Sequence, residues 1–252
     1  MSRNREGGSA RGEPLAEVKP QQHAPARRSG RASGRYGLLL LVLIATYLLA
    51  AFTEGQWVIN VQILAFVCTL LLALRNALVP KRIARAGLVF VLAVSGVVAG
   101  LALSSPSDTT LGVAQIWTGL ILLATVIVIV RHILADASVT LQSIYGALSA
   151  YMIIGLMFAA FYAAMYRFGG GSFFANGSPG NTRTFQYFSF TTLTTLGYGD
   201  FTAANNAGRA VAVMEAMAGQ IFLATLVARL VSAFRPSQPP EPPEDGEQRT
   251  PQ

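Results

Sequence analysis

The chain has 252 residues, of which 52% are hydrophobic and only 12% are charged, with a formal net charge of +7. Soluble domains carry about 25% charged residues, so this composition excludes an ordinary soluble globule. The charges avoid five long runs: 37–53, 57–74, 86–107, 109–130 and 137–166. Because about 20 apolar residues span the ~30 Å hydrocarbon core of a bilayer, the sequence predicts an all-α membrane protein with several spans.

Six spanning helices are predicted, with a long insertion before the last. Their ranges are Tyr36–Phe52, Trp57–Val79, Ala86–Leu103, Leu111–Val130, Val139–Met165 and Ala207–Phe234. They divide into a four-helix domain over residues 36–131 and a second domain over residues 132–235. The basic tail 1–35 and the proline- and acid-rich tail 236–252 are too polar to bury a core, so both are predicted to be disordered.

The basic residues predict the orientation of the spans, because cytoplasmic loops are enriched in Lys and Arg. The amino-terminal tail is basic, whereas the loops that hold Glu54 and Asp108 contain no basic residue. Both termini are therefore predicted to be cytoplasmic in a multi-pass protein of the cell (plasma) membrane. No apolar stretch precedes residue 36, so no cleavable signal peptide is predicted. The positive net charge is therefore interpreted as a signal of membrane topology and not of nucleic-acid binding. A further hypothesis is that the basic tail contacts anionic lipid.

The segment between the last two spans carries the chemistry. Phe168–Thr184 is rich in Gly, Asn and Pro, which is typical of an external loop. Phe185–Thr194 is predicted to be a re-entrant helix, tolerated only when it is buried in protein, with the negative end of its dipole favouring a cation. The following TLGYG segment, Thr195–Gly199, contains two glycines that tolerate backbone angles closed to other residues. Its carbonyl groups can therefore turn toward one axis.

The run TLGYGD, Thr195–Asp200, resembles the signature of the potassium channel family, with Leu196 where Val or Ile is usual. The resemblance covers the fifth and sixth spans and is to the six-transmembrane, one-pore-loop type, with a pore domain like the bacterial two-helix one. It implies a homotetramer that conducts K+ passively without a cofactor. In that family backbone carbonyls replace the hydration shell of the ion. The residues implied to bind K+ in a selectivity filter are Thr195, Leu196, Gly197, Tyr198 and Gly199.

The resemblance also implies residues that support the filter. Tyr187 and Phe188 would form an aromatic collar around Tyr198. Two interpretations stay open for Asp200: an anionic ring that concentrates cations, or a carboxylate hydrogen-bonded behind the filter.

Glu215 is the one carboxylate inside a predicted span, and an ionisable group at that depth indicates a functional site. We expect it to accept hydrogen bonds from Thr191 or Thr192 on the re-entrant helix. The alternative is a local ion pair with Arg209, although a spacing of six residues is poor geometry on a helix.

The sixth predicted span would line the pore below the filter. Gly219 lies where the family often has a hinge, although a helical glycine can equally mark close packing. One helical face is expected to line the cavity; it consists of Gln220, Leu223, Ala224 and Val227. The fourth span, Leu111–Val130, lacks the repeated arginines of a voltage sensor, so voltage gating is predicted to be weak or absent.

No catalytic constellation is present in the sequence, because His23 and His132 lack a nucleophile or metal partner at meaningful spacing. The chain is therefore not predicted to be an enzyme. One rival function is a non-conducting membrane sensor or regulatory subunit that keeps the pore fold. Another is a secondary transporter, which the absence of an internal repeat disfavours.

Overall fold

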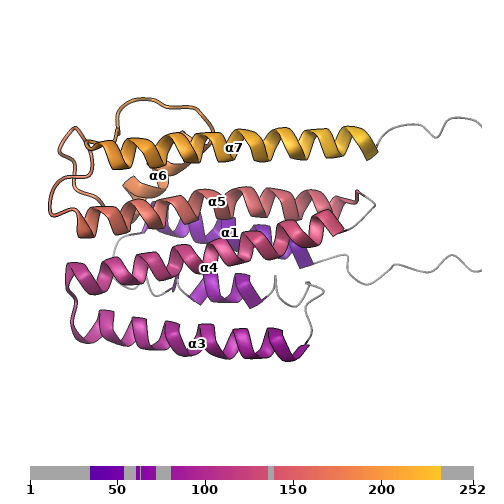
Figure 1. Ribbon diagram of the computed structural model, residues 1–252, viewed down its shortest axis with the longest axis horizontal. Coiled ribbons are helices and arrows are strands. Elements are labelled where there is room, and N and C mark those ends of the chain that lie inside the picture. The colour runs from indigo at the N-terminus through magenta and orange to yellow at the C-terminus, as the bar shows by residue number, and fades with distance from the viewer. Residues whose placement is uncertain (1–34, 54–60, 63, 72–80, 136–138, 234–252) are drawn as a thin grey trace, which may run out of the picture. The chain divides into compact units, whose positions relative to one another are not determined.

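The described part of the chain is built from helices (Figure 1). The computed structural model describes residues 35–53, 61–62, 64–71, 81–135 and 139–233, all within the unit Ser33–Gln252. The helices are α1 (Arg35–Phe52), α3 (Lys81–Ser104), α4 (Asp108–Ala135), α5 (Leu141–Phe168), α6 (Thr182–Leu193) and α7 (Asn206–Ala233). Residues 61–62 and 64–71 are also helical. Within these ranges the β-structure is limited to an isolated bridge between Phe174 and Ala203.

Among the described residues, four helices are long and apolar enough to cross a membrane: Ala86–Ser104, Asp108–Ala135, Leu141–Phe168 and Asn206–Ser232. They confirm the prediction of an all-α, multi-pass membrane protein. The first predicted span is also an apolar helix, α1, but it is shorter than these four. The second predicted span lies largely outside the described residues, as do both predicted tails.

Helix α5 is the centre of the bundle. Helices α1, α4, α6 and α7 all pack against it, and α3 packs against α4 (Figure 1). Within its apolar span 61% of α5 is buried, compared with 11% of α7 and 6% of α3. Helices α3 and α7 therefore present most of their apolar side chains outward, which leaves them available to lipid or to another chain.

Small residues allow α4 to approach α5 closely. A Cβ atom on Gly119 of α4 would lie 2.5 Å from the ring of Phe161 on α5, so a larger residue there would require that ring to move. On the other side of α4, the indole nitrogen of Trp117 donates a hydrogen bond to Ser95 of α3 at 2.9 Å. Close approach at small residues and hydrogen bonds between helices are the usual means of association in a membrane, where lipid tails are as apolar as the helices.

The ends of α5 and α6 are set by local capping. Thr140 and Ser143 form a capping box at the start of α5, and Asn181 and Thr184 form another at the start of α6. Such reciprocal bonds satisfy backbone N–H groups that lack a helical partner. The predicted start of the short helix at Phe185 is therefore wrong by three residues, because the Asn181 cap begins it at Thr182. The predicted external loop is correspondingly shorter and follows α5 only after Phe168.

Candidate functional site

The TLGYG segment directly follows α6, and the carboxyl end of that helix holds it in place. The last carbonyls of a helix lack helical partners. Here the backbone N–H of Thr195 donates to the Thr192 carbonyl at 2.9 Å, and that of Gly197 donates to the Thr191 carbonyl at 3.1 Å. The Leu193 carbonyl accepts a bond from the hydroxyl of Tyr151 on α5 at 3.2 Å. The end of α6 is thus tied both to the segment and to the central helix.

Backbone angles alternate in sign along the segment. Thr195, Gly197 and Gly199 have φ values of 58°, 52° and 82°, whereas Leu196 and Tyr198 between them do not have positive φ. Successive carbonyls of a uniformly extended chain point to opposite sides. Turning every second residue into the left-handed region changes this alternation, so that consecutive peptide groups can lie on the same side. The angles therefore suit a row of carbonyl oxygens facing one axis.

Thr195 is the costly member of this pattern. Positive φ is uncommon for any residue with a side chain and is a genuine outlier for a β-branched one. Its φ of 58° therefore stores strain that the surrounding bonds must offset. Strained backbone of this kind persists where neighbouring structure determines it, and it clusters at functional sites.

Asp200, at the outer end of the segment, is bonded to α6. Its carboxylate accepts hydrogen bonds from the hydroxyl of Tyr187 at 2.8 Å and from the backbone N–H of Phe201 at 3.1 Å. The bond to Asp200 is the main cause that raises the pKa of Tyr187 above its ordinary value. The ring of Tyr187 also stacks parallel to that of Tyr198, with centroids 6.4 Å apart and planes within 5°. This geometry favours the bracing role for Asp200 over a purely electrostatic one.

The outer loop holds the same end of the segment from the other side. The side-chain nitrogen of Asn176 donates to the Asp200 carbonyl at 2.8 Å. The N–H of Ala175 donates to Thr202 at 2.8 Å, and that of Ala204 donates to Phe173 at 2.9 Å. The loop before α6 and the chain after the segment are therefore joined by side-chain and backbone bonds.

Phe188 takes no part in this contact. It is buried with rings on the far side of α6, 5.0 Å from Tyr162, 5.9 Å from Phe173 and 5.7 Å from Phe174. The expectation that Phe188 forms a collar around Tyr198 is therefore wrong. Consecutive residues of a helix point about 100° apart, so Tyr187 and Phe188 face different neighbours. Phe188 instead fixes α6 against α5.

Glu215 on α7 is fully buried and bonded to both neighbouring helices. Its Oε1 lies 2.5 Å from the hydroxyl of Ser189 on α6, and its Oε2 accepts a bond from the hydroxyl of Tyr162 on α5 at 2.7 Å. The hydroxyl of Ser189 also lies 2.6 Å from the Gly155 carbonyl on α5. We call these residues, Tyr162, Ser189 and Glu215, the Glu215 cluster. It links the three helices that surround the TLGYG segment in this chain.

The prediction that Glu215 accepts a hydrogen bond from Thr191 or Thr192 is wrong. Their hydroxyls donate to the Phe188 carbonyl within α6, at 3.0 and 2.7 Å. The alternative ion pair is wrong as well, because the Nε atom of Arg209 donates to the Ala203 carbonyl at 3.0 Å. Glu215 does contact α6 as expected, through Ser189, but one turn further from the TLGYG segment than Thr192.

Gly219 packs against the end of α6. A Cβ atom at this position would lie 2.5 Å from the Leu193 carbonyl oxygen and 2.9 Å from its Cδ1. Helix α7 is continuous from Asn206 to Ala233 through this contact. Close packing thus accounts for the glycine here without any bend in the helix.

Much of the outward side of α7 has no partner in a single chain. Of the predicted cavity face, Gln220, Ala224 and Val227 are exposed and Leu223 is half-buried. Leu196 and Tyr198 of the TLGYG segment are likewise 56% and 68% exposed. The segment and this face of α7 are therefore accessible to further copies of the chain.

Residues 150–235 match a family model described as an ion channel. The match begins within α5 and includes the outer loop, α6, the TLGYG segment and α7. No curated protein and no solved structure matches the chain. An ion channel domain points to transport across a membrane rather than to catalysis, and to an oligomeric protein in contact with lipid. The site described above lies inside this channel domain.

Proposed function

We propose that the chain is a potassium-selective channel that conducts K+ passively through a homotetrameric pore. The observation that carries the proposal is the alternation of φ sign at Thr195, Gly197 and Gly199. A row of carbonyls from one chain supplies oxygens on only one side of an ion. A dehydrated cation needs oxygens on all sides, so symmetric copies must complete the site, and closed cyclic symmetry is the common solution.

The surroundings of the segment support the same proposal. Asp200 and the end of α6 hold the segment by hydrogen bonds at both ends, which would keep its oxygens at fixed spacing. The exposed face of α7 supplies an apolar wall for a cavity or a subunit interface. In this arrangement α5 is the outer helix, α6 the pore helix and α7 the inner helix. The full proposal has six spans, both termini in the cytoplasm and a plasma-membrane location.

The proposed channel is not gated by voltage. Moving one charge through 100 mV supplies only about 2.3 kcal/mol, so voltage sensors need several basic residues in one helix. Residues 111–130 of α4 contain none, and Arg131 stands alone after them. A steep dependence of conductance on voltage in planar bilayers would contradict this part of the proposal.

Flux of K+ into proteoliposomes tests the conduction proposal. The full chain is expected to pass K+ but not Na+, with block by Ba2+, and Gly197→Ala is expected to abolish the flux because alanine disfavours the φ of 52°. Gly100→Ala is the matched control, since a Cβ atom there meets nothing within 4 Å. Absence of flux from a folded oligomer would favour the non-conducting sensor, and flux coupled strictly to another ion would favour the transporter. Mass photometry of the purified protein checks the tetramer.

A further inference from the structure

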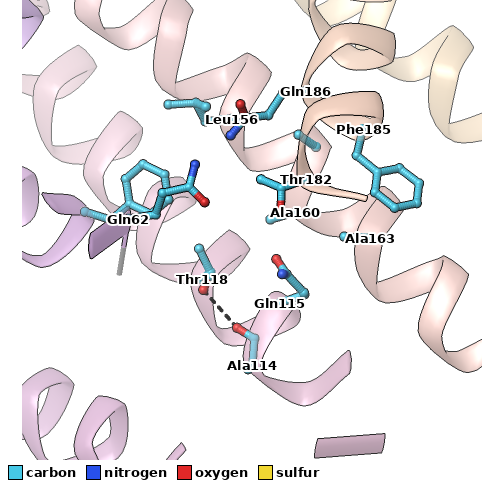
Figure 2. Close-up of a pocket in the computed structure, with 12 residues that line it drawn as sticks. Gln62, Ala114, Gln115, Thr118, Leu156, Ala160, Ala163, Thr182, Phe185 and Gln186 are labelled. Atoms are coloured by element: carbon cyan, nitrogen blue, oxygen red, sulfur yellow. Dashed lines mark hydrogen bonds between the residues drawn. The ribbon is translucent and has the colours of Figure 1, made fainter. Parts of the chain in front are cut away.

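Two buried glutamines face a pocket behind α6 without hydrogen-bond partners. Gln62, in the helical stretch 61–62 and 64–71, and Gln186, on α6, are only 6% and 5% exposed. Among the residues that the structure describes, Gln62 Nε2 and Gln186 Oε1 find no partner. Both side chains line the same pocket, and Figure 2 shows their amides directed into it from different helices. One orphaned atom is a donor and the other an acceptor.

Such orphaned groups are costly. A buried polar atom without a partner costs about 1–3 kcal/mol, and buried polar groups are nearly always satisfied by protein or by ordered water. Two complementary orphans in one pocket indicate that an occupant completes them.

The shape and lining of the pocket define that occupant. The inner cavity has a volume of about 50 Å³, and its described lining contains no charged residue. The amide of Gln115 and the hydroxyl of Thr118 add polar atoms on the α4 side (Figure 2). The Thr118 hydroxyl already donates to the Ala114 carbonyl at 2.9 Å. An uncharged polar group fits this end, because nothing in the lining would balance a charge.

A second cavity extends the pocket outward. It has a volume of about 140 Å³ and shares five lining residues with the first: Ala114, Gln115, Ala163, Thr182 and Phe185. Its other walls include Ala99, Leu103 and Leu111, which are apolar, and Arg167. A cavity of roughly 150 Å³ accommodates a molecule the size of benzene. The two parts together therefore suit a small amphiphile with its polar group at the glutamines.

We propose that this pocket binds a small uncharged amphiphile whose head group both donates and accepts hydrogen bonds, such as a primary carboxamide or an alcohol. The head group accepts from Gln62 and donates to Gln186, and the apolar body lies in the outer cavity. Because Gln186 is on α6, whose end carries the TLGYG segment, occupancy stabilises the position of the pore helix against the four-helix domain. Only this effect on conduction rests on the proposed channel function; binding does not.

Hexanamide is the probe for this site. Binding is measured by ligand-observed NMR titration of the full chain in nanodiscs, with empty nanodiscs subtracted to remove partition into lipid. Hexanamide is expected to bind saturably, whereas N,N-dimethylhexanamide, which lacks the donor, and hexanoate, which is charged, are expected to bind at least tenfold more weakly. Equal binding of all three, or no saturable binding of hexanamide, would overturn the proposal.

Variants locate the site. Gln62→Met and Gln186→Met keep the side-chain length but remove one hydrogen bond each, so each is expected to weaken hexanamide binding about tenfold. Without the probe these variants are expected to melt at the same or a higher temperature, because an orphaned buried group is removed. Thr69→Val is the control: it removes a buried hydroxyl from the same helical stretch, one that donates to Ala65 at 2.8 Å outside the pocket.

The outcomes separate binding from conduction. Unchanged affinity in both methionine variants, or lower melting temperatures than for Thr69→Val, would overturn the proposed site. If the full chain passes no K+ but hexanamide binds as described, the channel function fails while the site stands. If K+ passes, saturating hexanamide is expected to change the flux of the parent chain more than that of Gln186→Met.

Discussion

Replacing Ser189 by alanine tests whether the Glu215 cluster holds the channel domain together. The substitution removes one hydroxyl, which lies 2.5 Å from Glu215 Oε1 and 2.6 Å from the Gly155 carbonyl. Glu215 is fully buried, so water cannot replace the lost partner without opening the helix contact. Tyr162 would remain as the partner of the other carboxyl oxygen.

The cost follows from these contacts. The Ser189 hydroxyl has one proton, so it donates to only one of these two oxygens at a time. Leaving one carboxyl oxygen buried and unpaired costs about 1–3 kcal/mol, which is the expected loss in free energy of unfolding. For a domain of this size each kcal/mol lowers the melting temperature by roughly 2–4 °C, so the expected fall is about 2–12 °C.

Ser149→Ala is the matched control. Ser149 is as fully buried as Ser189, but its hydroxyl donates to the Tyr145 carbonyl within α5 at 2.8 Å. Its loss is expected to cost about 1 kcal/mol or less, because that carbonyl is in the same helix and alanine favours helix formation. Differential scanning calorimetry of the purified chain in nanodiscs measures the melting temperature of both variants.

Equal falls in melting temperature for the two serine variants would refute the reasoning. A second check uses Tyr162→Phe, which removes the other donor to Glu215. Because both substitutions act through one carboxylate, their combined effect is expected to differ from the sum by at least about 0.5 kcal/mol. Strict additivity would mean that Glu215 does not couple the helices.

Three further predictions concern the outer and inner ends of the TLGYG segment. Gly219→Ala is expected to destabilise the chain by about 1–3 kcal/mol through overlap with Leu193, whereas the same change at Gly100 should be neutral or stabilising by up to about 1 kcal/mol; thermal unfolding distinguishes them. Tyr187→Phe removes the donor to Asp200 and is expected to speed amide hydrogen exchange in residues 195–201; unchanged exchange would contradict the bracing role. Since the Asp200 bond raises the pKa of Tyr187, its stabilising contribution is present below the ordinary tyrosine value of about 10 and is lost as pH rises through the higher folded value. An alkaline absorbance titration measures the ionisation of Tyr187 once the signal of the Tyr187→Phe variant is subtracted. In Asp200→Asn this ionisation is expected at lower pH than in the parent chain.

The helical architecture could be predicted because its signals are local. Charge-free runs of about 20 residues specify spanning helices one at a time, and α3, α4 and α5 lie where those runs occur. Helix α7 carries Arg209, Glu215 and Arg229, but it is still long and apolar enough to span. The positive φ values at Gly197 and Gly199 follow in the same way from residue type. The ends of the helices were less predictable, because the Asn181 cap is polar and resembles a loop residue.

The partners of Glu215 could not be predicted, because they depend on how three helices pack. Tyr162 lies on α5, far from Glu215 in sequence, and nothing local to either residue indicates the pair. The position of α6 along the axis of α7 decides whether Ser189 or Thr192 faces Glu215, because these two residues are one helical turn apart. The orphaned amides of Gln62 and Gln186 are a still clearer case, since only the packed structure reveals a missing partner.

The contact between Gly219 and Leu193 has a mechanical consequence for the proposed channel. The α7 backbone leaves no room for even one methyl group beside the end of α6, and that end carries the strained Thr195. Rotation or bending of α7 at this level therefore displaces Leu193, and with it the first peptide of the TLGYG segment. In the proposed channel, a movement of α7 would therefore be transmitted to the TLGYG segment by direct steric contact.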